Sequence, residues 1–306
     1  MKAVITGGAG FIGSRLAEEL LKQKYSILII DNLVSGSKEN IPKSAKFVKK
    51  DIVKDDIANE LEDADVIFHF AAEPDVRSSA EKPEKSFNQN VVGTFNVLEA
   101  CRKNDIERVV FASTSTVYGE SETIPTPETM PCEPISNYGA SKLACESYVS
   151  SYSHSYGIKS TVLRYANIYG PPSTHGVIFD FYKKLKTNPR KLEILGNGKQ
   201  EKSYLFIDDC ISGTMIAFQK QKKEYDVFNI GSEIKHTVDE IAEQVCKNIG
   251  ISPIFEYTGG ERGWVGDVKL MLLDISKLKD IGWKERTTFE QGVKEYISWL
   301  KKGEKK

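Results

Sequence analysis

The sequence has few of the features that mark secreted, membrane-spanning or metal-stapled proteins. Its five cysteines, in 306 residues, are odd in number, widely spaced and without a C-x-x-C pair. This pattern argues against a disulfide framework or a structural zinc site, so we predict no metal. No apolar run approaches about 18 residues, and the first strand-like run begins at Lys2, which leaves no room for a secretory leader. We therefore expect a cytoplasmic protein.

The sequence also lacks an excess of charge of either sign. It has 42 basic and 43 acidic side chains, and its formal net charge is −1. A basic field of the kind that attracts polyanions is absent, so neither nucleic acid nor an anionic membrane is expected as a partner. With 40% apolar and 28% charged residues the composition is that of a globular protein, and the length predicts about two domains.

Short apolar runs alternate with longer stretches of helical periodicity through the first half of the chain. This alternation predicts an α/β fold with a doubly wound parallel sheet of the Rossmann type. Most of the runs are apolar throughout, as expected for strands that are buried on both faces. The expected strands are 3–6, 26–30, 47–48, 66–69, 108–111 and 160–163, and the clearest helices are 12–22, 83–103 and 138–156.

After about Arg164 the chain is broken by proline and glycine pairs, which predicts a second, smaller α/β lobe. Strands are expected at 204–207 and 226–230, joined by a helix that returns the chain to the main sheet. We expect the first domain to comprise 1–165 plus about 204–230, and the second about 166–203 plus 231–306. Asp208 and Asp209 are expected to cap the helix between the two strands.

A glycine-rich turn follows the first strand. Gly7 allows a sharp turn, Gly10 allows a pyrophosphate to approach the backbone, and Gly13 allows the helix to lie close to the strand. Phe11 and Ile12 lie in the first helical turn, whose free N–H groups face the phosphates. The motif follows a strand and opens a helix, which is the context that dinucleotide binding requires. The alternative is a glycine-rich turn without a ligand.

Three further strand ends supply candidate cofactor contacts. Asp31 ends the second strand, where a carboxylate accepts hydrogen bonds from a ribose diol and repels a 2′-phosphate, so NAD is favoured over NADP. Asp31 could instead be a turn residue. Asp51-Ile52 follows the third strand and is placed to meet the adenine. Phe70-Ala71-Ala72 follows the fourth, where small residues let the chain pass beside the cofactor; plain loop packing is the alternative for both segments.

A helix that opens near residue 137 places Tyr138 and Lys142 one turn apart on the same face. A phenol with a pKa near ~10 acts as a base near neutrality only when cations stabilise its anion, and Lys142 and an oxidised nicotinamide would supply them. Ser113 and Thr114 follow a buried strand, where either hydroxyl could hold a substrate oxygen. By itself Tyr-x-x-x-Lys is common on surface helices, and the hydroxyls could merely satisfy a turn.

Together these motifs resemble the extended short-chain dehydrogenase/reductase family, and most closely its UDP-glucose (UDP-galactose) 4-epimerase type, in a short archaeal-like branch. The resemblance runs over nearly the whole chain. It includes Thr6-Gly-Gly-Ala-Gly-Phe-Ile-Gly-Ser14, Asp31-Asn-Leu33, Asn90-Val-Val-Gly-Thr94, Val117-Tyr-Gly119, Tyr138-x-x-x-Lys142, Arg164-Tyr-Ala-Asn167, Phe228-Asn-Ile-Gly231 and Gly266-Asp-Val268.

The resemblance implies that NAD lies in the first domain and a UDP-sugar in the second. For NAD it adds the contacts Asn32, Ser35, Gly36, Asn90, Ser113, Tyr138, Lys142 and Tyr165. For the substrate it implies Thr114, Asn167, His175, Val177, Ile178, Ile194, Leu195, Arg262 and Asp267. Lys202 stands where many relatives have Arg, so it either meets the diphosphate or is a solvated lysine. Met271, four residues after Asp267, occupies the position that gates sugar size.

The implied reaction is epimerisation at C4 of the sugar through a 4-keto intermediate. Tyr138 takes the proton of the 4-hydroxyl, Thr114 holds the oxygen, and hydride moves to NAD⁺ and returns to the opposite face. Relatives that dehydrate or decarboxylate carry acids where this chain has Ser115 and Thr116, and neither hydroxyl can abstract a carbon-bound proton. Epimerisation is therefore favoured over elimination.

Several alternatives stay open. UDP-glucose and UDP-galactose are favoured substrates, but Met271 is compatible with an N-acetyl sugar, and UDP-glucuronate also remains. An NAD(P)-dependent reductase would use the same Tyr and Lys, and a nucleotide-sensing module would use only the glycine turn and Asp31. Tyr148, Tyr152 and Tyr156 recur every four residues and predict a helix-to-helix contact, so we expect a homodimer.

Overall fold

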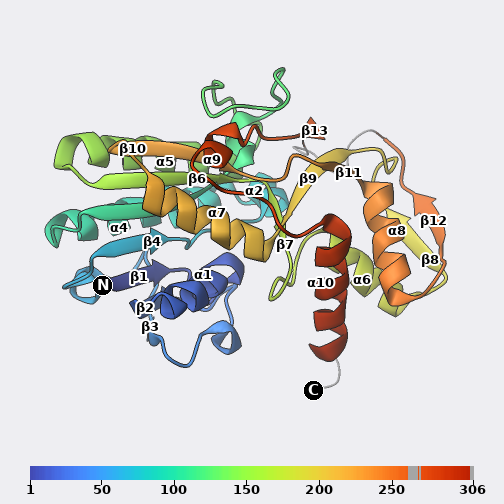
Figure 1. Cartoon of the computed structure of the whole chain (residues 1–306), viewed down its shortest axis with the longest axis horizontal. Coiled ribbons are helices and arrows are strands. Elements are labelled where there is room, and N and C mark those ends of the chain that lie inside the picture. The colour runs from blue at the N-terminus through green and yellow to red at the C-terminus, as the bar shows by residue number, and fades with distance from the viewer. Residues whose placement is uncertain (261–267, 269, 304–306) are drawn as a thin grey trace.

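The computed structural model describes residues 1–260, 268 and 270–303 (Figure 1). The chain is built on a seven-stranded sheet in the order β10-β6-β5-β4-β1-β2-β3, and all neighbouring strands run parallel. The prediction of a doubly wound parallel α/β sheet is confirmed. The strands are β1 (Lys2–Thr6), β2 (Ser26–Asp31), β3 (Lys46–Lys49), β4 (Val66–His69), β5 (Arg108–Thr114), β6 (Lys159–Tyr165) and β10 (Tyr225–Ile230).

Both faces of this sheet are buried, as the unbroken apolar strands predict. Side chains alternate between the faces, so Ala3 and Ile5 of β1 join one core while Val4 joins the other. Helices α1 (Phe11–Lys22) and α7 (Ile207–Lys220) cover the first face. Helices α4 (Gly93–Lys103) and α5 (Asn137–Tyr156) cover the second. The two pairs of helices lie on opposite sides of the strands in Figure 1.

The stretch predicted as one helix over 83–103 is divided in the structure. Helix α3 (Pro83–Ser86) leads into a π-helical turn, η3 (Phe87–Val92), before α4 begins. The wider turn carries Asn90, whose side chain is buried and hydrogen-bonded to the loop after β4. Short elements complete this half of the chain: α2 (Val76–Glu81) and the 3₁₀ turns η1 (Lys38–Asn40), η2 (Ala58–Leu61) and η4 (Ser115–Tyr118).

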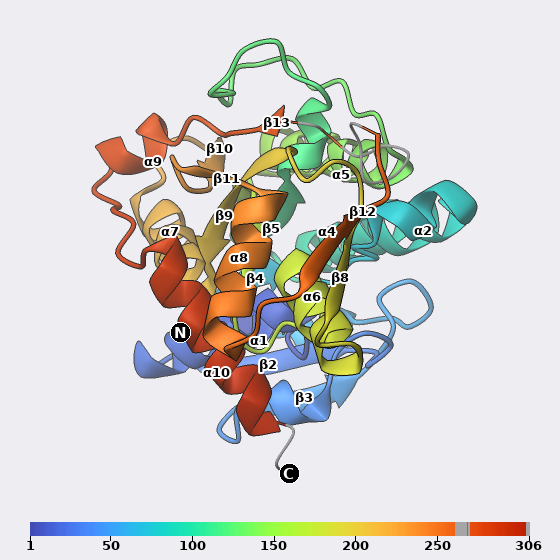
Figure 2. The ribbon, with the colours of Figure 1, turned by 90° about the vertical axis from the view of Figure 1, so that its right-hand side faces the viewer.

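A second group of elements lies beyond the carboxyl ends of the main strands. It contains a four-stranded sheet in which β9 is flanked by β11 and β13 and also pairs with β7. Helix α8 packs against both α6 and α10 (Figure 2). The elements are β7 (Asn167–Tyr169), α6 (Val177–Thr187), β9 (Glu201–Phe206), β11 (Lys235–Thr237), α8 (Val238–Ile249), β13 (Leu270–Met271), α10 (Phe289–Gly303) and a two-stranded sheet of β8 (Lys191–Ile194) and β12 (Ile254–Tyr257). Helix α9 (Ser276–Asp280) instead packs against β10 and α7.

The structure corrects the expectation for Asp208 and Asp209. Strand β9 ends at Phe206 and α7 begins at Ile207, so both acids lie inside the first helical turn and neither is the N-cap. Their partners are distant in the sequence: Asp208 pairs with Arg15 at 2.8 Å, and the Asp209 carboxylate accepts hydrogen bonds from the backbone N–H groups of Arg286 and Thr287. Asp209 therefore fastens the C-terminal segment to α7.

None of the helices in the described part of the chain combines the length and the apolar character needed to cross a bilayer.

Trp283 supplies a second attachment of the C-terminal segment to α7. Its side chain is almost fully buried, and its indole N–H donates to Ser212 Oγ at 2.9 Å. Because Trp283→Ala leaves a large cavity, we expect it to lower the free energy of unfolding by about 3–5 kcal/mol, measured by urea denaturation. Trp299→Ala on α10, where 36% of the side chain is exposed, is the control and should cost about 1 kcal/mol or less. Equal losses would contradict this assignment.

Candidate active site

The glycine turn lies where the loops after β1 and β4 meet. Gly7 has a φ of 73°, and its N–H donates to Ile30 O at 2.9 Å. A Cβ at Gly7 would lie 2.5 Å from the backbone nitrogen of Ala71, so a side chain cannot be accommodated there. The sheet order reverses between these two strands, which is the position where parallel sheets bind ligands.

Gly13 is closely packed and Gly10 is open, and this combination is compatible with dinucleotide binding. A Cβ at Gly13 would overlap Gly7 O, so Gly13 allows α1 to pack closely on the turn. At Gly10 a Cβ would meet only Gly7 O, at 3.1 Å, so the surface beside Gly10 is open. Helix α1 begins at Phe11, directly after it, and directs the positive end of its dipole into this space. The open surface and the helix end together form a cradle suited to two phosphates.

Asp31, at the end of β2, combines a turn role with free acceptor capacity. Its carboxylate accepts hydrogen bonds from the N–H of Ala9 at 3.0 Å and of Leu33 at 2.8 Å. A carboxylate has about four lone-pair sites, so capacity for a ribose diol remains. Asn32 reaches Asp51 at the end of β3. The structure therefore brings these predicted residues to one edge of the sheet.

The other predicted cofactor residues lie around the same edge. Gly36 packs against Ala9 of the glycine turn, with exposed Ser35 next to it in the chain. Ile52 is buried beneath α4. Phe70 donates its N–H to Thr6 O at 3.0 Å, and its ring centroid lies 6.2 Å from that of buried Tyr165.

Asn90 is engaged entirely by protein groups. Its amide accepts from the N–H of Glu73 at 2.7 Å and donates to Glu73 O and to Ser141 Oγ. Asn90 thereby fastens the loop after β4, including Ala71 and Ala72, to α5. Glu73, which the sequence analysis does not single out, forms an ion pair with Lys85.

Tyr138 and Thr114 meet where α5 begins and β5 ends. Burial of the phenol raises the pKa of Tyr138 to about 12, a hydrogen bond with Thr114 acts in the opposite direction, and the charges of Cys145 and Glu73 add to the rise. Thr114 Oγ1 also lies 3.1 Å from Thr116 Oγ1. A base at this position therefore needs nearby positive charge to ionise near neutral pH.

Lys142 lies one turn along α5 from Tyr138. It is 3% exposed, its ammonium donates to Ala112 O at 2.8 Å, and it lies 4.8 Å from the centre of the Phe111 ring. Burial lowers the pKa of Lys142 to about 8, while Cys145 and Glu146 oppose that shift. Its charge is therefore sensitive to pH in the range where enzymes work.

Ser113 does not turn its hydroxyl toward the glycine turn. It donates a hydrogen bond to Glu146, which is buried on α5 and paired with Arg164 on β6 at 2.6 Å. Glu146 is not among the site residues predicted from the sequence. The available signal is its spacing, since residues 138, 142 and 146 form one stripe of a helix.

Three predicted substrate residues lie together on the second sheet. Asn167 on β7 donates to Ser203 O of β9 at 3.0 Å. Met271 on β13 pairs with Lys202 on β9, and the Met271 side chain is buried. The ring of His175 lies 6.1 Å from that of Phe11, so a loop of the second group contacts the glycine turn.

The remaining predicted substrate residues differ in exposure. Val177 begins α6 and is partly exposed, whereas Ile178 is buried in the core. Ile194 is also fully buried at the end of β8, and Leu195 beside it is partly exposed. Arg262 and Asp267 lie outside the described residues.

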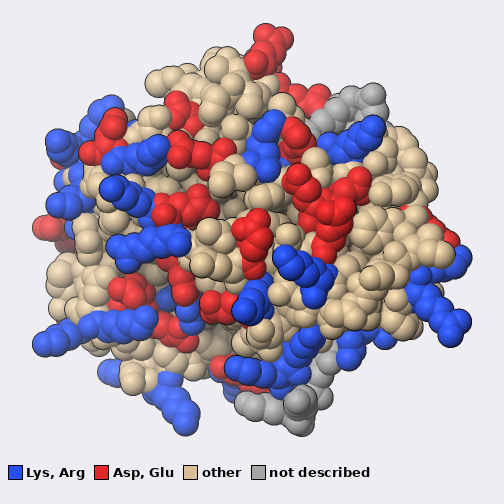
Figure 3. Space-filling view, turned by 45° about the vertical axis from the view of Figure 1, so that its right-hand side comes forward, with Lys and Arg blue, Asp and Glu red and all other residues tan. Residues whose placement is uncertain are grey.

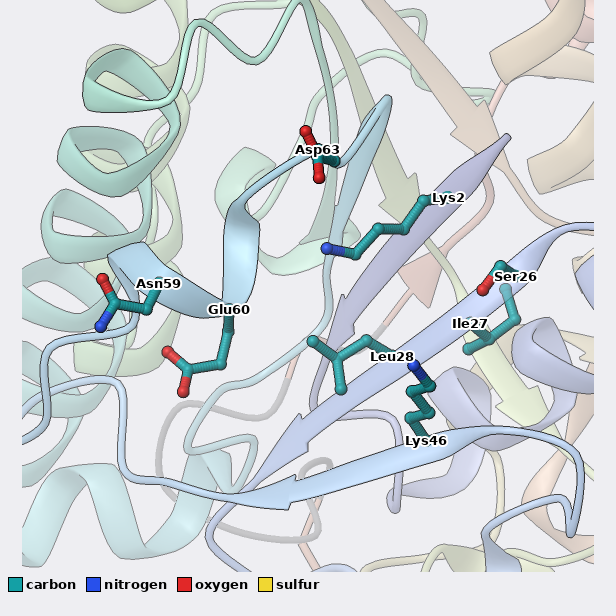
Figure 4. Close-up of a pocket in the computed structure, with 8 residues that line it drawn as sticks. All are labelled: Lys2, Ser26, Ile27, Leu28, Lys46, Asn59, Glu60 and Asp63. Carbon is teal, nitrogen blue, oxygen red and sulfur yellow. The ribbon is translucent and has the colours of Figure 1, made fainter.

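A surface depression elsewhere lies at the opposite end of the main sheet (Figure 4). It has a volume of about 280 Å³ and includes Lys2 and Ser26, the first residues of β1 and β2. It is lined by Lys2, Ser26, Ile27, Leu28, Lys46, Asn59, Glu60 and Asp63. It is therefore separate from the edge that carries Tyr138.

Known proteins resemble the whole chain. A crystal structure of a UDP-galactose 4-epimerase is 41% identical, with a TM-score of 0.91 and 99% coverage of both chains. A Methanocaldococcus jannaschii protein, provisionally named a UDP-glucose 4-epimerase, is 36% identical over 97% of this chain and 98% of its own. A Bacillus cereus UDP-glucuronic acid 4-epimerase, solved with UDP-glucuronic acid and NAD, is 29% identical, with a TM-score of 0.91 and 99% coverage of both chains.

A family profile agrees with these likenesses. Residues 3–231, which run from β1 to just beyond β10, match the profile of the NAD dependent epimerase/dehydratase family. The match spans the glycine turn, Asp31, Thr114 and the helix that carries Tyr138 and Lys142. The chain belongs to the NAD-dependent epimerase/dehydratase family, within its UDP-sugar 4-epimerases, and its cofactor is NAD.

Proposed function

We propose that the protein interconverts UDP-glucose and UDP-galactose by inverting C4 of the sugar. The observation that carries this proposal is the meeting of Tyr138, Thr114 and Lys142 at the carboxyl end of β5, next to the glycine turn. A phenol, a hydroxyl and an ammonium in this arrangement can remove a proton from an alcohol while the attached carbon is oxidised.

The residues around the glycine turn are proposed to hold NAD. The backbone at Gly7, Gly10, Phe11, Ile12 and Gly13 faces the diphosphate, and the Asp31 carboxylate accepts from the adenosine ribose. Bound there, the cofactor would supply reversible hydride acceptance from the sugar carbon. The other proposed contacts are Asn32, Ser35, Gly36, Asp51, Ile52, Phe70, Ala71, Ala72, Asn90, Ser113, Tyr138, Lys142 and Tyr165.

Tyr138 acts as the base in this proposal. Thr114 holds the sugar oxygen at C4 while the Tyr138 phenolate takes its proton, and the same group returns the proton after the sugar has turned over. In the protein without ligand, burial is the main cause that raises the pKa of Tyr138 to about 12. The ammonium of Lys142 and the positive charge of the oxidised cofactor oppose that rise by stabilising the phenolate.

The surroundings of Thr114 support epimerisation over elimination. Ser115 is buried, and the Thr116 hydroxyl shares a hydrogen bond with Thr114. Neither side chain can remove a proton bonded to carbon. In epimerisation the same sugar carbon is oxidised and then reduced, so the substrate undergoes no net oxidation. An NAD(P)-dependent reductase instead consumes its cofactor.

The second group of elements is proposed to bind the UDP-sugar as a separate lobe. Its proposed boundaries are about 166–203 plus 231–306, with 1–165 plus about 204–230 as the NAD-binding domain. Asn167 and Lys202 on neighbouring strands support a phosphate-binding role, and Met271 beside Lys202 supports a place next to the sugar. The further proposed contacts are Thr114, His175, Val177, Ile178, Ile194, Leu195, Arg262 and Asp267.

The charge distribution supports a small-molecule substrate rather than a polyanion. On the face shown in Figure 3, Lys and Arg side chains are interspersed with Asp and Glu. Such a surface does not present the basic stripe that nucleic acid or an anionic membrane requires.

A homodimer through α4 and α5 is proposed as well. Phe95 on α4 and Tyr148 and Tyr156 on α5 are exposed, and the rings of Phe95 and Tyr148 lie 6.0 Å apart between centroids. Tyr152, between the two tyrosines, is buried and donates to Glu99 at 2.8 Å. Exposed aromatic groups on two adjacent helices are typical of an interface.

Substrate conversion tests the proposal directly. The purified protein is incubated separately with UDP-galactose, UDP-N-acetylglucosamine and UDP-glucuronate without added reductant, and the C4 configuration is read by NMR. We expect conversion of UDP-galactose without net change in NAD, and a Tyr138→Phe protein about 10²–10⁴-fold slower. Stoichiometric use of the dinucleotide would instead indicate a reductase, and faster conversion of another sugar would reassign the substrate.

The charge of Lys142 predicts the alkaline limb of the pH profile. Because burial lowers the pKa of Lys142 to about 8, the ammonium is present below that pH and is lost above it. We expect kcat/KM to fall as the pH rises through about 8, since an uncharged Lys142 no longer stabilises phenolate. Lys142→Arg keeps its charge and should move the fall to higher pH. An unmoved fall in that variant would assign the ionisation to another group.

The dimer is tested by light scattering at low protein concentration. The wild-type protein should have about twice the mass of one chain. Tyr148→Glu should convert it to monomer because a desolvated carboxylate in an aromatic contact is unfavourable. Trp299→Glu, on exposed α10, is the control and should leave the mass unchanged. A monomeric wild type would end this proposal.

A further inference from the structure

Helix α5 makes three successive contacts with the last three residues of β5. The Tyr138 phenol lies near Thr114, Lys142 donates to Ala112 O, and Glu146 accepts from Ser113. The three side chains on α5 lie four residues apart, on one stripe of the helix. Only the first two have a place in the proposed reaction.

Glu146 is held on both carboxylate oxygens. Arg164 Nη2 donates to Oε2 at 2.6 Å, and Nε reaches Oε1 at 3.0 Å, in a two-pronged contact. Glu146 and Arg164 are both buried, and Arg164 is next to Ser113 in the register of β5 and β6. One carboxylate therefore joins α5 to two neighbouring strands immediately below Thr114.

Arg164 is itself fixed from the other side. Its Nη1 donates to Tyr118 OH at 2.8 Å and to Glu128 O at 3.2 Å, and the guanidinium carbon lies 4.7 Å from the centre of the Tyr118 ring. Tyr118 donates in turn to buried Asn229 at 2.8 Å. Burial opposes the charge on Arg164, but its bonds to Glu146 and the carboxylate's attraction raise its pKa, so the guanidinium stays charged.

We propose that Glu146, clamped by Arg164, is a positioning residue that sets the register of α5 against β5 through Ser113 and so holds Thr114 at the Tyr138 hydroxyl. Lys142, and Asn90 through Ser141, hold α5 near its N-terminus. Glu146 adds an anchor one turn further along the helix, at the residue next to Thr114. Misplacement by about 1 Å at a reacting group can cost about 10²-fold in rate, so such an anchor has a catalytic consequence.

The inference rests on the proposed roles of Tyr138 and Thr114. Ser113→Ala removes only the bond to Glu146 and leaves the ion pair in place. At saturating NAD we expect kcat to fall about tenfold with the KM for the UDP-sugar within about twofold of wild type, because the change acts on the geometry at Thr114. The matched control is Thr161→Ala, on β6, which also removes a buried hydroxyl bonded to a buried partner, Gln221. It should leave kcat unchanged.

A second variant guards against misfolding. Breaking a buried pair on one side is strongly destabilising, whereas apolar replacement of both partners is often tolerated. Glu146→Leu combined with Arg164→Met should therefore fold and bind NAD, yet lose about 10- to 100-fold in kcat. A folded double variant with wild-type kcat, or an equal loss in Thr161→Ala, would overturn the positioning role.

A spectroscopic readout separates this inference from the proposed function. The ionisation of Tyr138 with NAD⁺ bound is followed by tyrosinate absorbance, as the difference between each protein and its Tyr138→Phe counterpart. Thr114, Cys145 and Glu73 act on the pKa of this phenol, and Lys142 lies one turn along α5. A weaker Thr114 bond raises its pKa, so Ser113→Ala should shift the titration upward. If wild type converts no UDP-sugar, the proposed function fails, while the presence or absence of this shift still decides the inference.

Discussion

The parallel direction of seven strands is the constraint on which the rest of the structure depends. Because every strand of the main sheet points the same way, the loops that follow them gather at one edge. The sheet order reverses between β1 and β4, and the two loops at that point are separated by little more than the missing side chain of Gly7. The open surface at Gly10, the Asp31 carboxylate and the end of β5 are neighbours for this reason.

The proposed chemistry depends on charged groups that are buried away from water. Burial disfavours both the phenolate of Tyr138 and the ammonium of Lys142, so it raises the pKa of Tyr138 to about 12 and lowers that of Lys142 to about 8. Beneath them Glu146 and Arg164 cancel each other's charge, so the pair adds rigidity with little net field.

The main sheet, and the edge at the carboxyl ends of its strands, could be predicted from the sequence because both have local signals. The run 66–69 coincides with β4, and the glycine spacing and Asp31 fall where the turn and strand end require them. Long-range contacts have no such signal. The π turn around Asn90 reads as ordinary helix, Asp209 reads as a cap until residues 286–287 are seen beside it, and Glu146 is an unremarkable helical acid until folding brings Arg164 and Ser113 to it. Strand β9 was recognisable as a strand, yet its pattern does not say which sheet it joins.

The path of the chain between its sheets has a consequence for modular use of this fold. After β6 the chain leaves the main sheet for β7 and β9, returns through α7 to β10, and leaves again for β11 and α8. The C-terminal segment then comes back to α7 through Trp283. A contiguous stretch that contains every strand of the main sheet therefore also contains β7 and β9, and one that contains every strand of the second sheet also contains β10. A further domain can be fused to either end of such a chain. Neither sheet can be exchanged as one contiguous segment.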